Sequence, residues 1–293
     1  DAVLVVGGRQ EIRWEAIGTV PSVTLGYRLN KTGTEFQVLE PFWNNNGKYF
    51  WTIPDQISEE VELKVTDSRE PESFALSGVS KIRGSLAASI AGTKTDCPVG
   101  STQSISWDTI GTIPAVNLDY RHPEGIWKKI EHDLSNSGSF GWVIPDDVGT
   151  GIVIRVSNAA NSAVFSDVDQ TLSILPTFEF ISPAKGEKLR VDRDKELRGV
   201  TKGHSERVWI DYSVGNGWTE VEGPMENTGS FLWKVPDMLS REVRLRIRDA
   251  VMEQAYGISD VFQIQGILEM LMPQEGTVWR VGDTVTLAWK TTG

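Results

Sequence analysis

A short block of residues recurs three times in this 293-residue chain and constrains its fold more than any other feature. The segment 45–55 contains Asn-x-Gly, an aromatic residue, Trp51 and a closing Pro-Asp pair, and segments 136–146 and 227–237 repeat this order around Trp142 and Trp233. The period is 91 residues both times. A fixed period of this length, with every marker in register, is the signature of tandem domains.

A second marker, Ile-x-Trp-x-x-x-Gly, precedes each block and sets the domain boundaries. It occurs at 12–18 and 105–111, at 197–203 with Gly199 in place of tryptophan, and again at 287–293. We therefore predict three repeats, at 1–83, 84–176 and 177–266. Residues 267–293 are predicted to be the start of a fourth repeat.

Both ends of the chain fall inside a repeat, because residues 1–18 overlay residues 276–293 in register. The first repeat thus lacks the opening strand of the others. We expect the chain to be a window on a longer array. The alternative is that the tail completes the first repeat of a neighbouring molecule, as in donor-strand polymers.

Within each repeat, apolar residues alternate with polar or small ones. Segments 23–27, 116–120 and 208–212 follow this pattern, as do 61–65, 152–156 and 243–247. A period of two predicts half-buried strands, and glycine, proline and asparagine mark turns between them. About seven such strands in each repeat predict an all-β protein of tandem immunoglobulin-like or fibronectin-like β-sandwiches.

The tryptophans that recur in register are expected to form the sandwich cores, since aromatic side chains dominate the packing of small all-β domains. We assign the following residues to the core: Trp14, Trp107, Trp289, Trp51, Trp142 and Trp233. The Asn-x-Gly before each second tryptophan is expected to turn the chain through positive φ. The Pro-Asp after it is expected to end the strand.

Three other tryptophans have no aromatic counterpart in the other repeats and are candidates for contact with a partner. They are Trp43, Trp209 and Trp279. Tryptophan is enriched at interfaces. Trp43 follows Pro41-Phe42 and precedes three asparagines, which favours a loop. The expected partner is a neighbouring domain or chain, or a cell-wall glycan whose sugars stack on the ring. The alternative is that these tryptophans have no partner and pack locally within their own repeat.

No constellation typical of catalysis is evident, so we expect no enzyme activity. The three histidines lack metal-ligand spacing, and neither a nucleophile elbow nor a phosphate-binding loop is present. We expect no cofactor. Paired carboxylates at 146–147 and 192–194 leave calcium open as an alternative, although the pairs do not recur in register.

Charge and hydropathy exclude further classes of protein. A net charge of −11 without a basic, aromatic-rich stripe argues against nucleic-acid binding. No apolar run is long enough for a membrane helix. The single cysteine, Cys97, excludes a disulfide framework within the chain.

The boundaries between repeats are short. One or two residues separate the last strand of one repeat from the first strand of the next, around Pro176 and Gly266. Such junctions restrict rotation far more than a Gly/Ser linker would. We expect neighbouring repeats to be each other's partners, with homo-polymerisation through exposed strand edges as a further route to assembly.

The order of these markers, above all the Gly-x-aromatic-x-Trp-x-x-Pro-Asp block, resembles the Kre9/Knh1-type domain of Ser-Thr-rich, GPI-anchored cell-wall proteins, which also occurs in tandem in large bacterial surface proteins. The resemblance implies an extracellular or cell-surface setting. Together with the repeats, it favours a structural segment of a large surface protein that forms a semi-rigid stalk or assembles into a filament. The alternative is a carbohydrate-binding array or an adhesin stalk.

Overall fold

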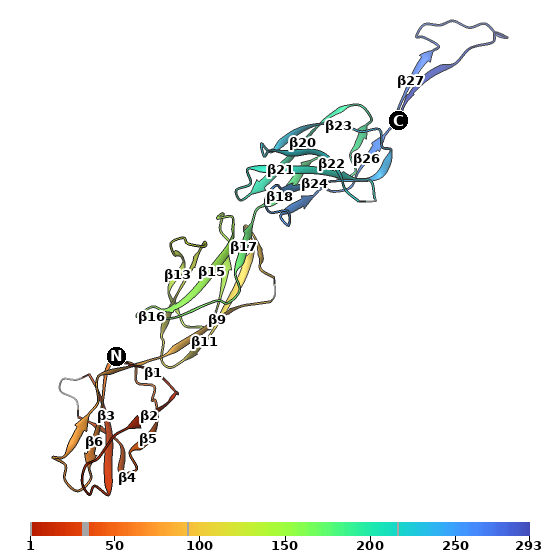
Figure 1. The fold of residues 1–293 in the computed structure, drawn as a ribbon. Coiled ribbons are helices and arrows are strands. Elements are labelled where there is room, and N and C mark those ends of the chain that lie inside the picture. The colour runs from red at the N-terminus through yellow and green to blue at the C-terminus, as the bar shows by residue number, and fades with distance from the viewer. Residues whose placement is uncertain (1, 31–34, 93, 216) are drawn as a thin grey trace. The chain divides into compact units, whose positions relative to one another are not determined.

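The computed structural model describes residues 2–30, 35–92, 94–215 and 217–293, and every regular element among them is a β-strand (Figure 1). The chain divides into two compact units. One comprises 1–95, 103–142 and 151–172, and the other comprises 96–102, 143–150 and 173–293. None of the described residues forms a helix of the length and apolarity needed to cross a membrane.

The first repeat contains one large and one small sheet. The large sheet has the order β1-β8-β6-β3-β4, with β7 also paired to β6, and the small sheet is the pair β2-β5. Their bounds are β1 Ala2–Val5, β2 Arg9–Arg13, β3 Ser22–Leu29, β4 Gln37–Asn44, β5 Lys48–Thr52, β6 Ser58–Asp67, β7 Phe74–Leu76 and β8 Ser80–Arg83.

The second repeat has the same large sheet, in the order β10-β17-β15-β12-β13 with β16 on β15, and a three-stranded sheet β14-β11-β9. The strands are β9 Ser85–Ile90, β10 Asp96–Pro98, β11 Thr102–Ile110, β12 Ala115–Arg121, β13 Lys128–Ser135, β14 Ser139–Val143, β15 Gly149–Asn158, β16 Asn161–Asp167 and β17 Leu172–Leu175.

The third repeat follows the second closely, with a large sheet β19-β26-β24-β21-β22, β25 on β24, and a small sheet β18-β20-β23. The strands are β18 Thr177–Ser182, β19 Lys188–Arg190, β20 Asp194–Lys202, β21 Arg207–Ser213, β22 Thr219–Glu226, β23 Ser230–Lys234, β24 Ser240–Asp249, β25 Tyr256–Ile258 and β26 Phe262–Gln265. After it, β27 (Ile267–Met272) and β28 (Ala288–Thr292) form a two-stranded sheet.

The fold is therefore all-β, with three tandem immunoglobulin-like β-sandwiches, as the alternating pattern predicts. Among the residues that the structure describes, all three repeats contain more strands than the seven we expected, with eight in the first repeat and nine in each of the other two. In the second and third repeats the opening segment contributes a strand to each sheet (β9 then β10, β18 then β19), and in all three repeats one further strand (β7, β16 or β25) extends the large sheet. In the described part of the chain, β2 pairs with β5 alone, so the first repeat has no counterpart of β9 or β18.

One aromatic pair recurs in the core of each repeat. Trp51 lies 5.1 Å from Tyr27 between ring centroids. The corresponding pairs Tyr120–Trp142 and Tyr212–Trp233 are 5.0 Å and 6.0 Å apart, and the interplanar angle is 42° in all three. Tilted rings at this spacing add attraction beyond the area they bury.

Each Asn-x-Gly turn passes through positive φ as expected, but only at its glycine, and the asparagine acts through its side chain. Positive φ falls on the glycines, Gly47, Gly138 and Gly229, and not on the asparagines. Instead, the amide of Asn136 donates to the Ile113 carbonyl, 2.8 Å away. This hydrogen bond fixes the turn against the neighbouring loop.

Candidate functional site: the junctions between repeats

The repeats meet through the glycine that ends each Ile-x-Trp-x-x-x-Gly marker. Three of these residues, Gly111, Gly203 and Gly293, lie against the preceding repeat, and we call them the junction glycines. Their φ angles are +83°, +90° and +105°, in the region that favours glycine. Each junction glycine follows the end of a small-sheet strand, which positions its turn toward the previous domain.

The first junction glycine is closely enclosed. A Cβ atom at Gly111 would stand 3.0 Å from Val6 Cγ2 and 3.3 Å from both Asp55 Oδ1 and Gly84 Cα. Such distances are shorter than ordinary van der Waals contact. The absence of a side chain at Gly111 is therefore what lets the two repeats approach.

The other two junctions use equivalent parts. A Cβ at Gly203 would stand 2.9 Å from Val148, 3.0 Å from Val99 and 3.1 Å from Pro176. A Cβ at Gly293 would meet Gly266, Leu239 and Val191 at 2.9, 3.0 and 3.3 Å. A valine and the residue that links two repeats thus recur at every junction: Val6 and Gly84, Val99 and Pro176, Val191 and Gly266.

The backbone fixes each of these valines beside its linker. The Val6 N–H donates to the carbonyl of Arg83, the last residue of β8, at 3.0 Å. Val99 and Val191 donate in the same way to the last residues of β17 and β26, at 2.9 and 3.1 Å. A single residue then separates this strand from the next repeat, at Gly84, Pro176 and Gly266.

The first junction adds polar contacts. Asp55 Oδ1 accepts the backbone N–H of Thr112, and Asp55 Oδ2 accepts the Thr112 hydroxyl, both at 2.8 Å. Asp55 belongs to the Pro-Asp pair that the sequence predicts as a strand stop. It also joins its repeat to the next.

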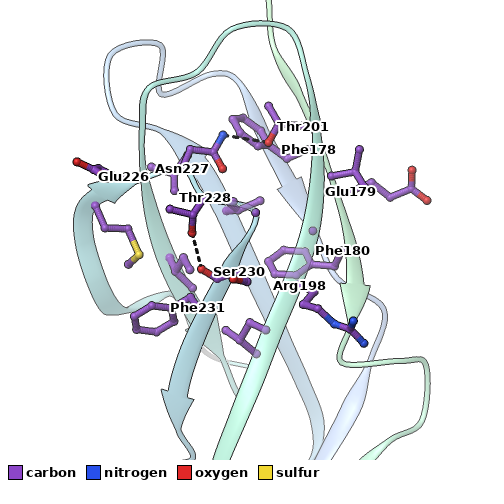
Figure 2. Close-up of a pocket in the computed structure, with 18 residues that line it drawn as sticks. Phe178, Glu179, Phe180, Arg198, Thr201, Glu226, Asn227, Thr228, Ser230 and Phe231 are labelled. Carbon is purple, nitrogen blue, oxygen red and sulfur yellow. Dashed lines mark hydrogen bonds between the residues drawn. The ribbon is translucent and has the colours of Figure 1, made fainter.

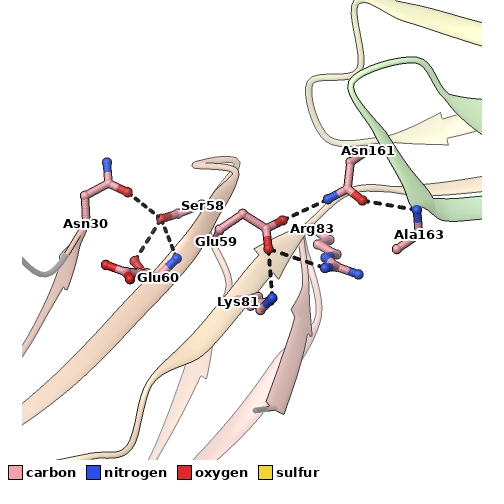
Figure 3. Close-up of polar contacts among 8 residues, drawn as sticks. All are labelled: Asn30, Ser58, Glu59, Glu60, Lys81, Arg83, Asn161 and Ala163. Carbon is pink, nitrogen blue, oxygen red and sulfur yellow. Dashed lines mark hydrogen bonds and ion pairs between the residues drawn. The ribbon is translucent and has the colours of Figure 1, made fainter.

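Glu59 makes a second bridge across the first junction (Figure 3). Its Oε1 accepts the Asn161 amide at 2.8 Å, and its Oε2 lies 2.9 Å from Lys81 Nζ and 3.4 Å from Arg83 Nη2. The hydrogen bond from Lys81 is the main cause that lowers the pKa of Glu59, which keeps the carboxylate charged. Because the side chain is exposed, the ion pairs orient Glu59 more than they stabilise the fold.

The second junction is apolar. Leu175, which ends β17, is buried in one cluster with Phe178, Val208 and Ala255 of the third repeat. Apolar burial contributes about 25 cal/mol per Å², so this cluster couples the linker to the third sandwich.

Most of the tryptophans expected in the core are placed there. Trp51, Trp142, Trp233 and Trp107 are all buried, and Trp14 is half-buried against the core of the first repeat. Trp289 is 61% exposed, but the sequence holds only the predicted start of the fourth repeat, so its place in a core stays a prediction. It lies on β28, and the β27–β28 pair has no second sheet among the described residues to cover it.

The three unshared tryptophans do not come together in one surface. Trp43 is half-buried, packs edge-on against Tyr49 at 5.1 Å and donates to the Lys48 carbonyl. It lies on strand β4 and not in a loop, which corrects our reading of the Pro-Phe-Trp segment. Proline is tolerated there because β4 is at the edge of its sheet.

Trp209 and Trp279 have different surroundings. Trp209 is half-buried on β21, with the Arg248 guanidinium 4.9 Å from its ring centroid. Trp279 is 52% exposed between β27 and β28. Among the described residues, no group of three or more His, Cys, Asp or Glu is placed to hold a metal ion.

Comparison with known proteins gives a likeness of fold alone. No family model matches the chain, and no curated protein does. Among solved structures, the N-terminal eight Ig domains of the Down Syndrome Cell Adhesion Molecule match 92% of the chain at 14% identity and a TM-score of 0.30. The chain spans 35% of that structure's length.

Two further structures show the same limited likeness. Titin domains I67–I69 match 90% of the chain and 95% of their own length, at 10% identity and a TM-score of 0.30. The fibronectin(III)-like modules of Clostridium thermocellum CbhA match 60% of the chain and 92% of their own length, at 12% identity and a TM-score of 0.24. At such values the likeness says nothing of what this chain binds.

Sequence reasoning identified the junctions as short but missed the residues that make them. The signal was present, because the glycine that ends the second marker is kept in all four copies, including the third, where the tryptophan is lost. A residue retained when its motif partner is replaced has a role of its own.

Proposed function

We propose that this chain is a non-enzymatic structural segment of a large extracellular or cell-surface protein, in which tandem β-sandwiches are coupled into a semi-rigid stalk. The observation that carries the proposal is the junction, where the same glycine, valine and single linking residue recur three times. A flexible string of independent domains would not need, at each boundary, a glycine in a conformation that other residues rarely adopt.

Direct contact between repeats supports stiffness, because rotation about a one-residue linker must break it. At the first junction such rotation would separate Asp55 from Thr112 and Glu59 from Asn161. At the second it would expose Leu175 to water. Stability in such arrays is the sum of each repeat and its neighbour interfaces.

The acidic net charge and the resemblance to the Kre9/Knh1-type domain support the surface setting. The glycan-binding alternative depends on Trp43 as a platform for sugar stacking. Its edge-on contact with Tyr49 and its bond to Lys48 give that alternative less support, since part of the ring is already covered.

The test compares Gly111→Ala and Gly203→Ala with Gly18→Ala in the whole chain. Gly18 has the same place in the marker and a φ of +89°, but nothing lies within 4 Å of the Cβ it would carry. All three variants therefore bear the same backbone strain, about 1–2 kcal/mol. Only the first two also force a methyl group into a junction.

Small-angle X-ray scattering and ¹⁵N relaxation are the readouts. We expect the Gly111 and Gly203 variants to scatter as more flexible chains and to show independent tumbling of the repeats beside the altered junction. The Gly18 variant should behave as wild type. Indistinguishable flexibility in all three variants, with each repeat still folded by circular dichroism, would refute the stalk.

A further inference from the structure

The third repeat lacks the tryptophan that its counterparts place beneath the small sheet. Trp14 and Trp107 occupy this position in the first two repeats, and Gly199 occupies it in the third. Trp107 is only 4% exposed, so the second repeat is filled at this point.

Part of the missing aromatic volume has moved to the neighbouring strand. In the second repeat Trp107 pairs across the ladder with Ala88, whereas in the third repeat Gly199 pairs with Phe180. The large side chain of the pair lies on β11 in the second repeat, whereas in the third repeat it lies on β18, the strand opposite β20. The exchange leaves a narrow pocket of about 30 Å³ between the small sheet and the strands opposite (Figure 2), which is room for about two water molecules.

The walls of this pocket are largely apolar. They include Phe178, Phe180, Phe231, Val208 and Met225, and Figure 2 shows Asn227 and Thr201 toward one end with Phe180 and Phe231 toward the other. The pocket is therefore apolar along its length and polar at one end, but it is far smaller than an ordinary small-ligand site, so a ligand ring enters only when a wall side chain such as Phe180 moves aside.

The polar end retains the bonding arrangement that elsewhere receives tryptophan. In the second repeat Asn136 donates through Nδ2 to Thr109 Oγ1 at 3.0 Å and to the Ile113 carbonyl at 2.8 Å. Its Oδ1 is thereby turned to accept Trp107 Nε1 at 2.6 Å. Asn45 accepts Trp14 Nε1 in the same way, at 2.7 Å.

Asn227 keeps both anchoring bonds but not the ring. Its Nδ2 donates to Thr201 Oγ1 at 3.0 Å and to the Ser205 carbonyl at 3.1 Å, which matches the bonds of Asn136. Its Oδ1 accepts no hydrogen bond from the residues that the structure describes. The acceptor for an indole N–H is therefore in place without a donor.

We propose that this pocket opens to bind an indole group as the Phe180 side chain moves aside, with the ring against Phe178 and Phe231 and its N–H donated to Asn227 Oδ1. The occupant is identified by the repeats themselves, because two of them fill the equivalent position with the indole of their own tryptophan. The ligand class is a small indole or an indole-bearing side chain. The inference does not depend on the stalk.

The first experiment uses the unaltered chain and ¹⁹F NMR of two ligands of the same shape, 5-fluoroindole and 5-fluorobenzofuran. Only the indole carries an N–H donor. We expect saturable broadening of the indole signal and about fivefold weaker binding of the benzofuran, the usual effect of one neutral hydrogen bond. N-acetyl-tryptophanamide distinguishes the sources, since tighter binding than free indole indicates a tryptophan side chain.

Two variants locate the site. Phe180→Ala widens the slot to match Ala88 and should strengthen indole binding several-fold. Gly199→Trp combined with Phe180→Ala recreates the Trp107–Ala88 pair and should abolish binding. A Cβ at Gly199 would stand 2.9 Å from the Glu179 carbonyl oxygen, and β18 must shift slightly to admit it.

A third variant keeps the test decisive if the double variant does not fold. Trp107→Gly opens the same slot in the second repeat, beside Asn136, and should add a second indole site. The proposal is overturned if the unaltered chain shows no saturable indole binding, or if indole and benzofuran bind equally, or if the folded double variant binds as well as wild type.

Discussion

The bond between the core tryptophan and the asparagine of each turn permits a quantitative test of how the repeats are stabilised. Asn136→Ala removes the side-chain hydrogen bonds to three residues at once, Trp107, Thr109 and Ile113. Asn227→Ala in the third repeat removes only the two that correspond to Thr109 and Ile113. The difference between the two losses isolates the bond to the indole.

The magnitude follows from the burial of Trp107. Its ring is almost fully buried, so truncation of Asn136 leaves the indole N–H without an acceptor. An unsatisfied buried donor costs about 1–3 kcal/mol. We therefore expect the local free energy of opening to fall by about 1–3 kcal/mol more for Asn136→Ala than for Asn227→Ala, which is roughly 5- to 140-fold faster amide exchange.

Hydrogen exchange measured by mass spectrometry is the suitable assay, because a multi-domain chain does not unfold in one two-state transition. Peptides that cover β11 report on the second repeat and peptides that cover β20 report on the third. Equal acceleration in the two repeats would show that the indole bond contributes nothing beyond the anchoring bonds, and the reasoning would be refuted.

Two further predictions concern single titratable groups. Cys97 is buried at the register position of Leu4 and Leu189, and burial raises the pKa of its thiol, so we expect slow reaction with a thiol reagent until urea unfolds the chain; fast labelling of the native protein would contradict this. The pKa of Glu59 is lowered by its bond to Lys81, so its contribution to the first junction should be complete above its ordinary value of 4.5 and lost as pH falls through the lower folded value. The side-chain amide signals of Asn161 should report this transition, and should not show it in Glu59→Gln; a midpoint at or above 4.5 would contradict the assignment.

The fold was accessible from sequence because its determinants are local and repeated. The alternation of apolar and polar residues in segments such as 116–120 predicts a strand with one buried face without any knowledge of its partners. Because the pattern recurs in three copies in register, the prediction is stronger than one copy would allow. The recurrence of Trp51, Trp142 and Trp233 indicates a shared core for the same reason. These features do not depend on knowledge of any neighbouring domain.

The remaining features depend on contacts that sequence does not display. Trp289 carries the same motif as Trp107, yet burial depends on whether a second sheet covers it. Gly111 looks like an ordinary turn glycine until Val6 and Gly84 are placed beside it. The exchange of the Trp107–Ala88 pair for the Gly199–Phe180 pair could not be predicted from sequence. The paired residues lie on neighbouring strands, and only the structure gives the register between those strands.

In each repeat the first strand of the large sheet runs parallel to the last strand of the repeat, and this has a mechanical consequence. Residues 2–5 pair with 80–83, 96–98 with 173–175, and 188–190 with 263–265. When a chain is pulled from both ends, tension reaches these two strands, in the second and third repeats after it has passed through β9 or β18, and draws them past each other lengthwise. All the hydrogen bonds of a pair then bear the load together instead of opening one after another, as they would in a hairpin pulled apart at its open end. Each sandwich is thus built to resist force along the chain, and its lifetime under tension is governed by the rate of forced unfolding.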